Sequence, residues 1–306
     1  MQAAIDIGSN TVRLLIGEVQ AGQVQVHNQA LITTRLGNTR VGEKLSVEGR
    51  AKTIAALRRF QQQLAAAGVT RPPVVAATSA VREALDGADF QQEVARELGW
   101  QLQILAGAEE AACSYAGAAS VLAQLPGSDN DSAQPVIIDV GGGSTELICR
   151  QADGRIVGKS VKVGAVRLFN GEVSAENLRP LLAELLTVLP RPVGADRGGG
   201  YRFVSVGGTI TLVAALLAGV TVYEREAVSG RRVSRAEIER LAAALRPLTP
   251  AQRLQKYPLL QGREDIILAG LQIYLTLADL LGAAEFIASD AGLLDGLLLR
   301  REYDEE

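Results

Sequence analysis

Two segments of the chain combine residue types that could hold phosphate groups. In each segment an aspartate lies near the end of an apolar run, and small residues follow it closely. The first segment contains Asp6, Gly8, Ser9 and Asn10, and the second, 133 residues later (139 − 6), contains Asp139, Gly141, Gly142, Gly143, Ser144 and Thr145. Glycines allow backbone N–H groups to converge on an anion, and hydroxyl groups add further donors. The pattern predicts two phosphate-binding turns, each between two strands.

A single glycine-containing turn would be weak evidence, because glycine is common in turns of any function. Neither turn is a Walker loop, since Gly-Lys-Ser/Thr is missing and a strand rather than a helix is expected to follow. A purely structural interpretation is weakened because the same aspartate and turn occur twice, once with three consecutive glycines.

Carboxylates beside these turns indicate a metal ion. Asp139 and Glu146 flank the triple-glycine turn, so both can approach the same bound anion. Two carboxylates would repel a phosphate chain, and Mg²⁺ resolves this conflict by binding carboxylates, phosphate oxygens and water together. We therefore expect Mg²⁺ at Asp139 and Glu146, with Asp6 as a further carboxylate. The alternative is that Glu146 is only a solvated strand residue.

The composition excludes several classes of hydrolase. The chain has 306 residues, 47% apolar and 21% charged, as in an average soluble protein long enough for two domains. His27 is its single histidine, whereas histidine-rich zinc sites, Ser-His-Asp triads and His/Asp two-metal domains need more. We expect Cys113 and Cys149 to be small buried thiols. The net charge of −3 argues against broad nucleic-acid binding.

No segment predicts a membrane location. The most apolar stretch, 209–222, is shorter than the roughly 20 residues that cross a bilayer, so we expect a buried helix there. The N-terminus lacks a basic region followed by an uncharged apolar one, so no signal peptide is visible. These features predict a cytoplasmic protein.

Hydrophobic periodicity indicates the elements that must position these residues. Residues 3–36 alternate in three runs and predict an antiparallel meander. Further strands are expected at 74–77, 100–105, 136–140 and 286–288, and helices at 46–67, 89–98, 109–122, 210–217, 234–245, 264–281 and 292–300. Capping boxes are expected at Asp89/Gln92 and at Ser234/Glu237.

The chain also indicates where one domain ends and another begins. Residues 126–135 have the composition of a linker, and the plan of strand, turn and strand restarts beyond them. We therefore expect a first domain over 1–125 and a second over 135–306. A second polar stretch, 190–200, is interpreted as a surface loop.

Five strings of residues resemble the exopolyphosphatase and guanosine-pentaphosphate phosphatase family and follow its order along nearly the whole chain. They are IDIGSNTVRL (5–14), TSAVREA (78–84), GAEEA (107–111), DVGGGSTE (139–146) and SDAGL (289–293). The family belongs to the superfamily of actin, hexokinase and heat-shock ATPases. The resemblance implies an α/β fold of two ribonuclease-H-like domains around a central cleft. It also implies that the last helix, about 291–301, packs back on the first domain.

The resemblance gives roles to further residues. Glu110 would be the general base that activates the attacking water, and Glu109 a supporting or metal-linked carboxylate. Arg82 would clamp a phosphate with its fixed fork of donors. The turn Gly207, Gly208, Thr209 would face a nucleotide or the distal phosphates. Simpler interpretations exist, because two acids suit the first turn of any helix and arginines are common at surfaces.

These assignments predict an exopolyphosphatase, which uses Mg²⁺ to hydrolyse the terminal phosphoanhydride of inorganic polyphosphate by in-line attack of water. Removal of the terminal phosphate of guanosine pentaphosphate is the closest alternative. An ATP-dependent small-molecule kinase and an actin-like nucleotide-binding protein are alternatives from other classes. A requirement for a monovalent cation such as K⁺ and a homodimer stay open, and no nucleic-acid or membrane partner is expected.

Overall fold

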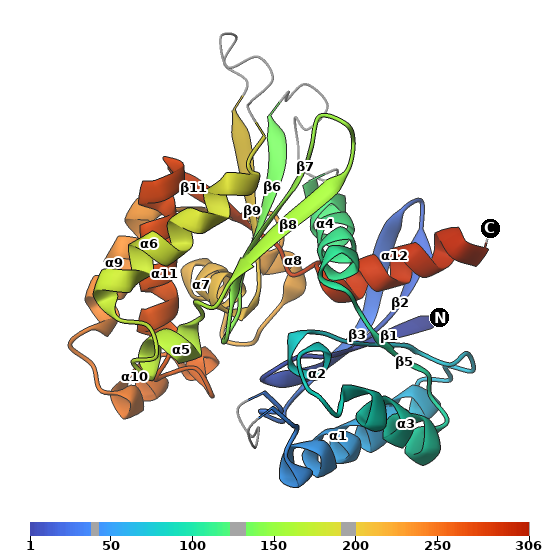
Figure 1. Cartoon of the computed structure of the whole chain (residues 1–306). Helices are drawn as coiled ribbons and strands as arrows, with labels where there is room; N and C mark the ends of the chain where they lie inside the picture. The colour runs from blue at the N-terminus through green and yellow to red at the C-terminus, as the bar shows by residue number, and fades with distance from the viewer. Residues whose placement is uncertain (38–42, 123–132, 191–199, 306) are drawn as a thin grey trace. The chain divides into compact units, whose positions relative to one another are not determined.

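The computed structural model describes residues 1–37, 43–122, 133–190 and 200–305. The chain forms two compact units, drawn in Figure 1. Unit 1 contains Met1–Gly117 together with Leu293–Glu306, and unit 2 contains Ala118–Gly292. The chain therefore passes from one unit to the other inside a helix that precedes the expected linker. Most of that linker, and most of the polar stretch 190–200, lie outside the described residues.

The sheet of unit 1 has the strand order β3-β2-β1-β4-β5. Its meander consists of β1 (Gln2–Ile7), β2 (Thr11–Gln20) and β3 (Gln23–Thr33), which pair antiparallel as predicted. Two strands then join in parallel, β4 (Val74–Ala77) next to β1 and β5 (Leu102–Ile104) next to β4. The last strand is shorter than the sequence indicated.

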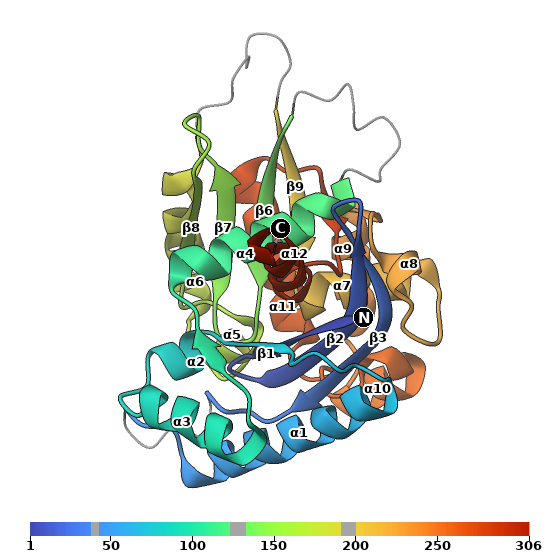
Figure 2. The same ribbon diagram turned by 90° about the vertical axis from the view of Figure 1, so that its right-hand side faces the viewer.

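Helices cover both faces of this sheet, as Figure 2 shows. They are α1 (Val47–Ala66), α2 (Ser79–Arg82), α3 (Gly87–Leu98), α4 (Gly107–Leu122) and α12 (Leu293–Glu305). Ile5 and Ile7 pack into the cluster that contains α1 and α3, whereas Ala4 packs with Leu297 and Leu298 of α12. Because successive strand residues point to opposite faces, β1 is buried on both sides.

One predicted helix start in unit 1 is wrong, and the contacts give the reason. The helix predicted from Asp89 begins at Gly87, so Asp89 and Gln92 form no capping box. The residue before the helix, Asp86, instead accepts a hydrogen bond from the Leu45 amide at 2.9 Å. A β-carbon on Gly87 would lie 2.4 Å from the Val81 carbonyl oxygen, so the close approach requires glycine.

Unit 2 repeats the plan of unit 1 with the strand order β8-β7-β6-β9-β11-β10. Its strands are β6 (Gln134–Val140), β7 (Thr145–Arg150), β8 (Ile156–Val161), β9 (Tyr201–Val206), β10 (Arg232–Ser234) and β11 (Glu285–Ala288). Again three antiparallel strands come first, and β9 and β11 join in parallel. The edge strand β10 is an addition that unit 1 does not show among its described residues.

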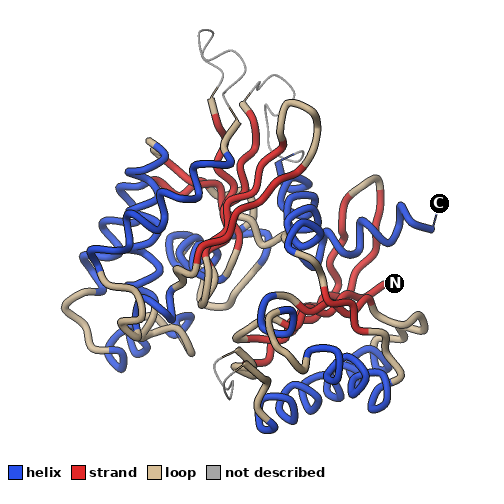
Figure 3. Tube along the Cα trace, in the orientation of Figure 1, coloured by secondary structure: helices blue, strands red, loops and turns tan. Residues whose placement is uncertain are grey.

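The helices of unit 2 include α6, α9 and α11, which lie together on one side of its strands (Figure 3). The α-helices are α5 (Ala165–Phe169), α6 (Ala175–Ala183), α7 (Gly208–Ala218), α8 (Arg225–Val228), α9 (Arg235–Leu245), α10 (Pro250–Lys256) and α11 (Ile267–Leu281). Two 3-10 helices, Glu184–Val188 and Pro258–Leu260, also occur among the described residues of this unit. The capping box of Ser234 and Glu237 is confirmed, whereas α11 begins three residues later than predicted.

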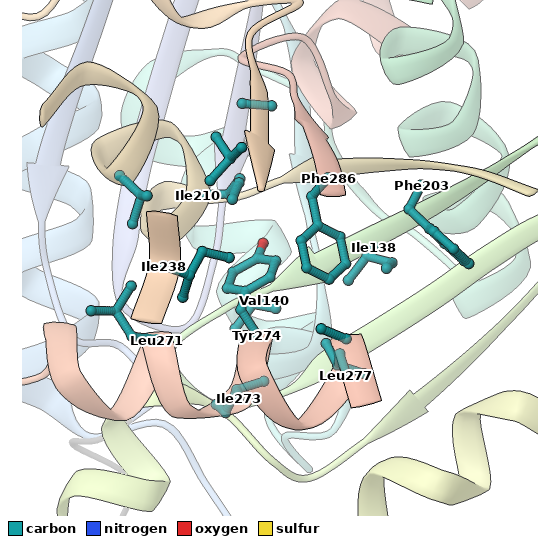
Figure 4. Packing of buried hydrophobic residues seen from close by; sticks show 14 of the residues in the cluster. Ile138, Val140, Phe203, Ile210, Ile238, Leu271, Ile273, Tyr274, Leu277 and Phe286 are labelled. Atoms are coloured by element: carbon teal, nitrogen blue, oxygen red, sulfur yellow. The ribbon is translucent and has the colours of Figure 1, made fainter. Parts of the chain in front are cut away.

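The core of unit 2 centres on Tyr274 and Phe286, whose rings meet edge to face at 5.3 Å (Figure 4). The buried helix expected within 209–222 is α7, of which residues 209–215 are buried. Both cysteines are buried, as predicted, and neither forms a disulfide. Among the described residues, no helix combines the length and the apolar character that spanning a membrane requires.

Candidate functional site

The predicted site residues of unit 1 lie at one edge of its sheet. Strands β1, β4 and β5 run parallel, so their carboxyl ends share that edge, where ligands of α/β sheets commonly bind. The turn Gly8–Asn10 follows β1, Arg82 lies in the short helix after β4, and Glu109 and Glu110 open the helix after β5. Residues far apart in the sequence thus come together at this edge.

The turn after β1 presents backbone donors. Gly8 closes it by donating its N–H to the Thr11 carbonyl at 3.0 Å. The carbonyl of Ser9 accepts from Gly37, and that of Asn10 accepts from the two amides of residues 34 and 35. The N–H groups of Ser9 and Asn10 have no acceptor within the part of the chain that the structure describes. Because the carbonyls of Ser9 and Asn10 already accept hydrogen bonds while their N–H groups remain available as donors, the turn suits an anion.

The predicted base and the predicted phosphate clamp contact each other. Arg82 donates through Nη1 to Glu110 at 2.7 Å and to the Leu105 carbonyl at 2.9 Å. Both charged side chains are about one-third exposed, at 32% and 29%. The ion pair holds the carboxylate of Glu110 in a fixed place, and Nε and Nη2 of Arg82 have no acceptor among the described residues.

The neighbouring acid has a different environment. Glu109 accepts a hydrogen bond from the Ala106 amide at 3.0 Å, which caps the first turn of α4. Its other oxygen lies 3.5 Å from Arg300 of α12, and no pattern of spacing along the chain predicted this ion pair. Glu109 therefore has the capping role that its position in a first helical turn indicates.

Asp6 is paired with an arginine across the hairpin. Arg13 stands directly opposite it in the register of β1 and β2 and donates two hydrogen bonds to its Oδ2, the shorter at 2.7 Å. Asp6 is buried, with 4% of its surface exposed, and its Oδ1 has no hydrogen-bond partner among the described residues. The arginine already balances the charge of this aspartate.

In unit 2 the equivalent hairpin brings two acids together. Asp139 and Glu146 are direct partners in the register of β6 and β7, so their side chains lie on the same face of the sheet. Glu146 accepts a hydrogen bond from the Ser160 hydroxyl of β8 at 2.6 Å. No group of three or more His, Cys, Asp or Glu suited to a metal occurs among the described residues. A pair of carboxylates fits Mg²⁺, which binds one or two together with phosphate oxygens and water.

The triple-glycine turn between these strands also presents donors. Gly141 donates to the Ser144 carbonyl at 3.0 Å, the same closing bond as in the first turn. The N–H groups of Gly142, Gly143 and Ser144 have no acceptor in the described part of the chain. Thr145 differs, because its buried hydroxyl donates to the Val163 carbonyl at 2.6 Å. The backbone of the turn, rather than the Thr145 side chain, is therefore available to an anion.

The third predicted turn lies at the start of α7. Gly207 has a φ of +90°, and a β-carbon there would lie 2.6 Å from Oδ1 of Asp139. A β-carbon on Gly208 would lie 2.3 Å from the Arg263 guanidinium, so the glycine makes room for this cation. Thr209 is buried. The positive end of an 11-residue helix and an arginine thus stand beside the carboxylate of Asp139.

Sequence reasoning missed two tyrosines beside acids of unit 2. Burial, together with the charge of Asp139, raises the pKa of Tyr274, and burial with Asp290 raises the pKa of Tyr223. Both phenols therefore stay protonated and can donate hydrogen bonds. Tyr274 lies in the apolar pattern of a core helix, so nothing in the sequence distinguished it from an ordinary core residue.

Two surface hollows lie elsewhere. One of about 640 Å³ is lined by residues that include Phe169 and Gln272, and one of about 350 Å³ by residues that include Gln91 and Leu102. None of the residues predicted to bind phosphate or metal lines either hollow. Neither changes the assignment of the site.

Comparison with known proteins identifies relatives that match nearly the whole chain. Exopolyphosphatase 2 of Mycobacterium tuberculosis is 30% identical over 97% of this chain and 97% of its own length. A guanosine-5'-triphosphate,3'-diphosphate pyrophosphatase of Aeromonas hydrophila is 26% identical over 97% of this chain, which spans 58% of that protein.

Solved structures show the same fold. A Ppx/GppA family member from Aquifex aeolicus superposes with a TM-score of 0.78 at 25% identity, covering 99% of this chain and 98% of that chain. An exopolyphosphatase from Cytophaga hutchinsonii, 20% identical, has a TM-score of 0.78 over 99% and 97% of the two chains. The predicted α/β fold with two ribonuclease-H-like, actin-like domains is confirmed.

The model of the Ppx/GppA phosphatase family matches residues 15–305, which include most of the strings that carried the resemblance. The two alternatives from other classes, an ATP-dependent small-molecule kinase and an actin-like nucleotide-binding protein, lose their support, because a family of phosphatases accounts for nearly the whole chain. By this match and by its relatives, the chain belongs to the Ppx/GppA phosphatase family.

Proposed function

We propose that the protein is an exopolyphosphatase that uses Mg²⁺ to release terminal orthophosphate from inorganic polyphosphate. The observation that carries this proposal is the pair of turns whose N–H groups have no acceptor in the described part of the chain. Rows of backbone donors suit a chain of phosphate groups, which offers anionic oxygens at every link. The relative named Exopolyphosphatase 2, matched over 97% of both lengths, supports this substrate class.

Phosphate binding is assigned to residues of both units, because both carry a turn with available donors. The proposed phosphate ligands are Gly8, Ser9, Asn10, Arg82, Gly141, Gly142, Gly143, Ser144, Gly207, Gly208 and Thr209. Glycines and helix N-termini would contribute through their N–H groups. Arg82 would contribute through Nε and Nη2, because its bonds to Glu110 and Leu105 use only Nη1. Thr145 is assigned to holding the hairpin, since its hydroxyl donates to Val163.

Asp139 and Glu146 would hold Mg²⁺, because they are direct cross-strand partners whose side chains lie on the same face of the sheet. When bound, Mg²⁺ supplies positive charge that offsets the repulsion between carboxylates and phosphates. Ser160, by donating to Glu146, would fix the orientation of that ligand. Asp6 is assigned to its ion pair with Arg13 rather than to the metal.

Glu110 is proposed as the general base. It would accept a proton from the attacking water as a new bond forms between the water oxygen and the terminal phosphorus. The bridging P–O bond breaks, and the shortened chain leaves with the electron pair of that bond. Arg82 would both orient the carboxylate of Glu110 and bind a phosphate, which brings base and substrate together.

The direct test is release of orthophosphate from long-chain polyphosphate by the purified protein with Mg²⁺. Glu110→Gln is expected to lower kcat by roughly 10² to 10⁴-fold, the usual contribution of a general base, with a smaller change in KM. Glu97→Gln is the matched control, because Glu97 forms a similar ion pair with Arg58, at 2.6 Å, on helices away from the site. Full activity of Glu110→Gln would reject the base, and an inactive unmutated protein would reject the function.

Guanosine pentaphosphate is the second candidate substrate, since the Aeromonas relative is named for a guanosine nucleotide. Competition between this nucleotide and polyphosphate for the same preparation distinguishes the two. Under the present proposal, kcat/KM for polyphosphate is the larger of the two values, and the reverse order would assign the nucleotide.

A further inference from the structure

A short segment after β8 holds every carbonyl of the triple-glycine turn. The Gly141 carbonyl accepts from the Ala165 amide at 3.0 Å, and the Gly142 carbonyl accepts from the Val166 amide at 2.9 Å. The Gly143 carbonyl is bound differently, because it accepts from Nε of the Arg167 side chain at 2.9 Å. Two of the three carbonyls are therefore held by backbone, and the third by a side chain.

Holding these carbonyls determines where the donors of the turn point. In a trans peptide the C=O and the following N–H point in opposite directions. Fixing the carbonyls of residues 141–143 toward α5 therefore turns the N–H groups of residues 142–144 away from it. These are the N–H groups that lack an acceptor among the described residues. The direction of the Ser144 N–H is thus coupled to the bond between Arg167 and Gly143.

The turn and α5 are built for close approach. A β-carbon on Gly164, just before α5, would lie 2.3 Å from the Gly142 carbonyl oxygen, so the contact requires glycine at that position. Gly143 itself has no side chain to restrict its peptide, and glycine is the residue with the widest backbone freedom. Without an external bond to its carbonyl, the peptide between Gly143 and Ser144 would be held less firmly, by the closing bond from Gly141 to Ser144 and by the start of β7.

The guanidinium of Arg167 is itself held in place. Its Nη1 donates to Glu172 at 2.7 Å, and the two side chains are 39% and 48% exposed. Nη2 has no acceptor in the described part of the chain. Glu172 thus balances the charge and orients the planar fork, while Nε reaches the turn.

We propose that Arg167 is a positioning residue for phosphate binding, which acts by fixing the Ser144 N–H toward the substrate, with Glu172 orienting Arg167. This proposal rests on the proposed function, because it concerns the same phosphate-binding turn. Removing the Arg167 side chain should weaken phosphate binding more than it slows the chemical step, since Glu110 and its proton transfer are untouched.

The experiment compares KM and kcat for polyphosphate, affinity for tripolyphosphate with Mg²⁺ by calorimetry, and Tm, in Arg167→Met. We expect KM and the calorimetric Kd to rise about 10-fold, the size expected for losing one hydrogen bond to a charged group. The change in kcat should be under about 3-fold and Tm should be nearly unchanged, since the side chain is partly exposed. Glu172→Gln should raise KM by about 2-fold to 3-fold, as for a surface pair.

Arg155→Met is the matched control, because Arg155 also pairs with a nearby acid, Asp153 at 2.6 Å, on the surface of the same unit. Its KM should equal that of the unmutated protein. Arg167→Lys tests the same idea with the charge retained. Its affinity should lie between those of Arg167→Met and the unmutated protein, because one amine can bond Gly143 or Glu172 but cannot bond both as the guanidinium fork does.

Each outcome has a distinct meaning. If the unmutated protein binds and hydrolyses polyphosphate but Arg167→Met has the same KM and Kd, the positioning role is rejected while the function stands. A loss of Tm in proportion to the loss of affinity, in both Arg167→Met and Arg167→Lys, would also reject it, because the effect would then be structural. If the unmutated protein neither binds nor hydrolyses polyphosphate, the proposed function fails, irrespective of Arg167.

Discussion

The hairpins β1–β2 and β6–β7 have the same frame and differ in one charge. Each is closed by the same backbone hydrogen bond, from Gly8 to Thr11 and from Gly141 to Ser144, both at 3.0 Å. Each places an aspartate near the end of its first strand. Opposite Asp6 stands Arg13, which pairs with it at 2.7 Å, whereas the residue opposite Asp139 is a second acid.

Under the proposed function, this difference would let the two turns share phosphate binding but not metal binding. In unit 1 the arginine neutralises the aspartate inside the protein, so a cation would add uncompensated positive charge. In unit 2 the facing carboxylates repel each other, and a divalent ion relieves that repulsion when phosphate is present. A repeated motif therefore does not imply a repeated role, because the cross-strand partner contributes to the charge of the site.

The strongest test of this difference between the hairpins is to place an acid–arginine pair in the second hairpin, as in the first. Glu146→Arg places an arginine opposite Asp139 in a register that already accommodates such a pair in unit 1. We expect Mg²⁺-dependent kcat/KM to fall by about 10³-fold, since a proposed metal ligand is lost and a positive charge takes its place. Phosphate release is measured across a Mg²⁺ titration.

Glu146→Gln is the control for the charge swap, because it removes the charge without adding an opposite one, and its loss should be smaller. Circular dichroism is used to check that both variants are folded. Retention of full Mg²⁺-dependent activity by Glu146→Arg would contradict the metal assignment.

Removing the arginine of the first hairpin should affect stability more than metal dependence. Arg13→Met leaves Asp6 buried without its partner, and we expect the free energy of unfolding to fall by about 2 kcal/mol, discounted because Arg13 is itself 39% exposed. Urea denaturation measures this change, and the Mg²⁺ concentration for half-maximal activity should stay the same.

The double variant Asp6→Asn/Arg13→Met tests the same pair. It removes the charge that the single variant leaves buried, so it should recover part of the lost stability. A shift of the Mg²⁺ requirement in Arg13→Met alone would show that the first hairpin does take part in metal binding.

Ser160 sharpens the comparison by testing the support of the second acid. Ser160→Ala removes the hydroxyl that donates to Glu146 at 2.6 Å. We expect the Mg²⁺ concentration for half-maximal activity to rise about 10-fold, as for other groups that orient a metal ligand. The Mg²⁺ concentration for half-maximal activity is measured at saturating polyphosphate. An unchanged Mg²⁺ requirement would show that Glu146 does not depend on this bond.

The smallest effect is expected for Glu109, whose bonds are those of a helix cap. Glu109→Ala should cost about 1 kcal/mol of stability, as the loss of a cap does, while kcat stays within about 3-fold of the unmutated value. Thermal denaturation and phosphate release are measured on the same preparation. A loss of kcat as large as that expected for Glu110→Gln would show that both acids act in catalysis.

How far the site could be predicted depends on how local each interaction is. The capping box of Ser234 and Glu237 was correct because both partners lie within one helical turn. The helix predicted at Asp89 was misplaced because Asp86 bonds to Leu45, 41 residues away. The same limit hid Arg167, whose bond to Gly143 spans 24 residues and has no periodic signal.

The sequence by itself determined the two turns, their aspartates, and the fact that Asp139 and Glu146 flank one of them, because a hairpin is a local structure whose pairing follows from its own residues. Only the tertiary structure decided that Arg82 binds Glu110, that Arg300 reaches Glu109, and that Arg167 holds the turn. Those contacts join residues brought together by the parallel order of strands and the packing of helices, and such proximity leaves no pattern of spacing along the chain.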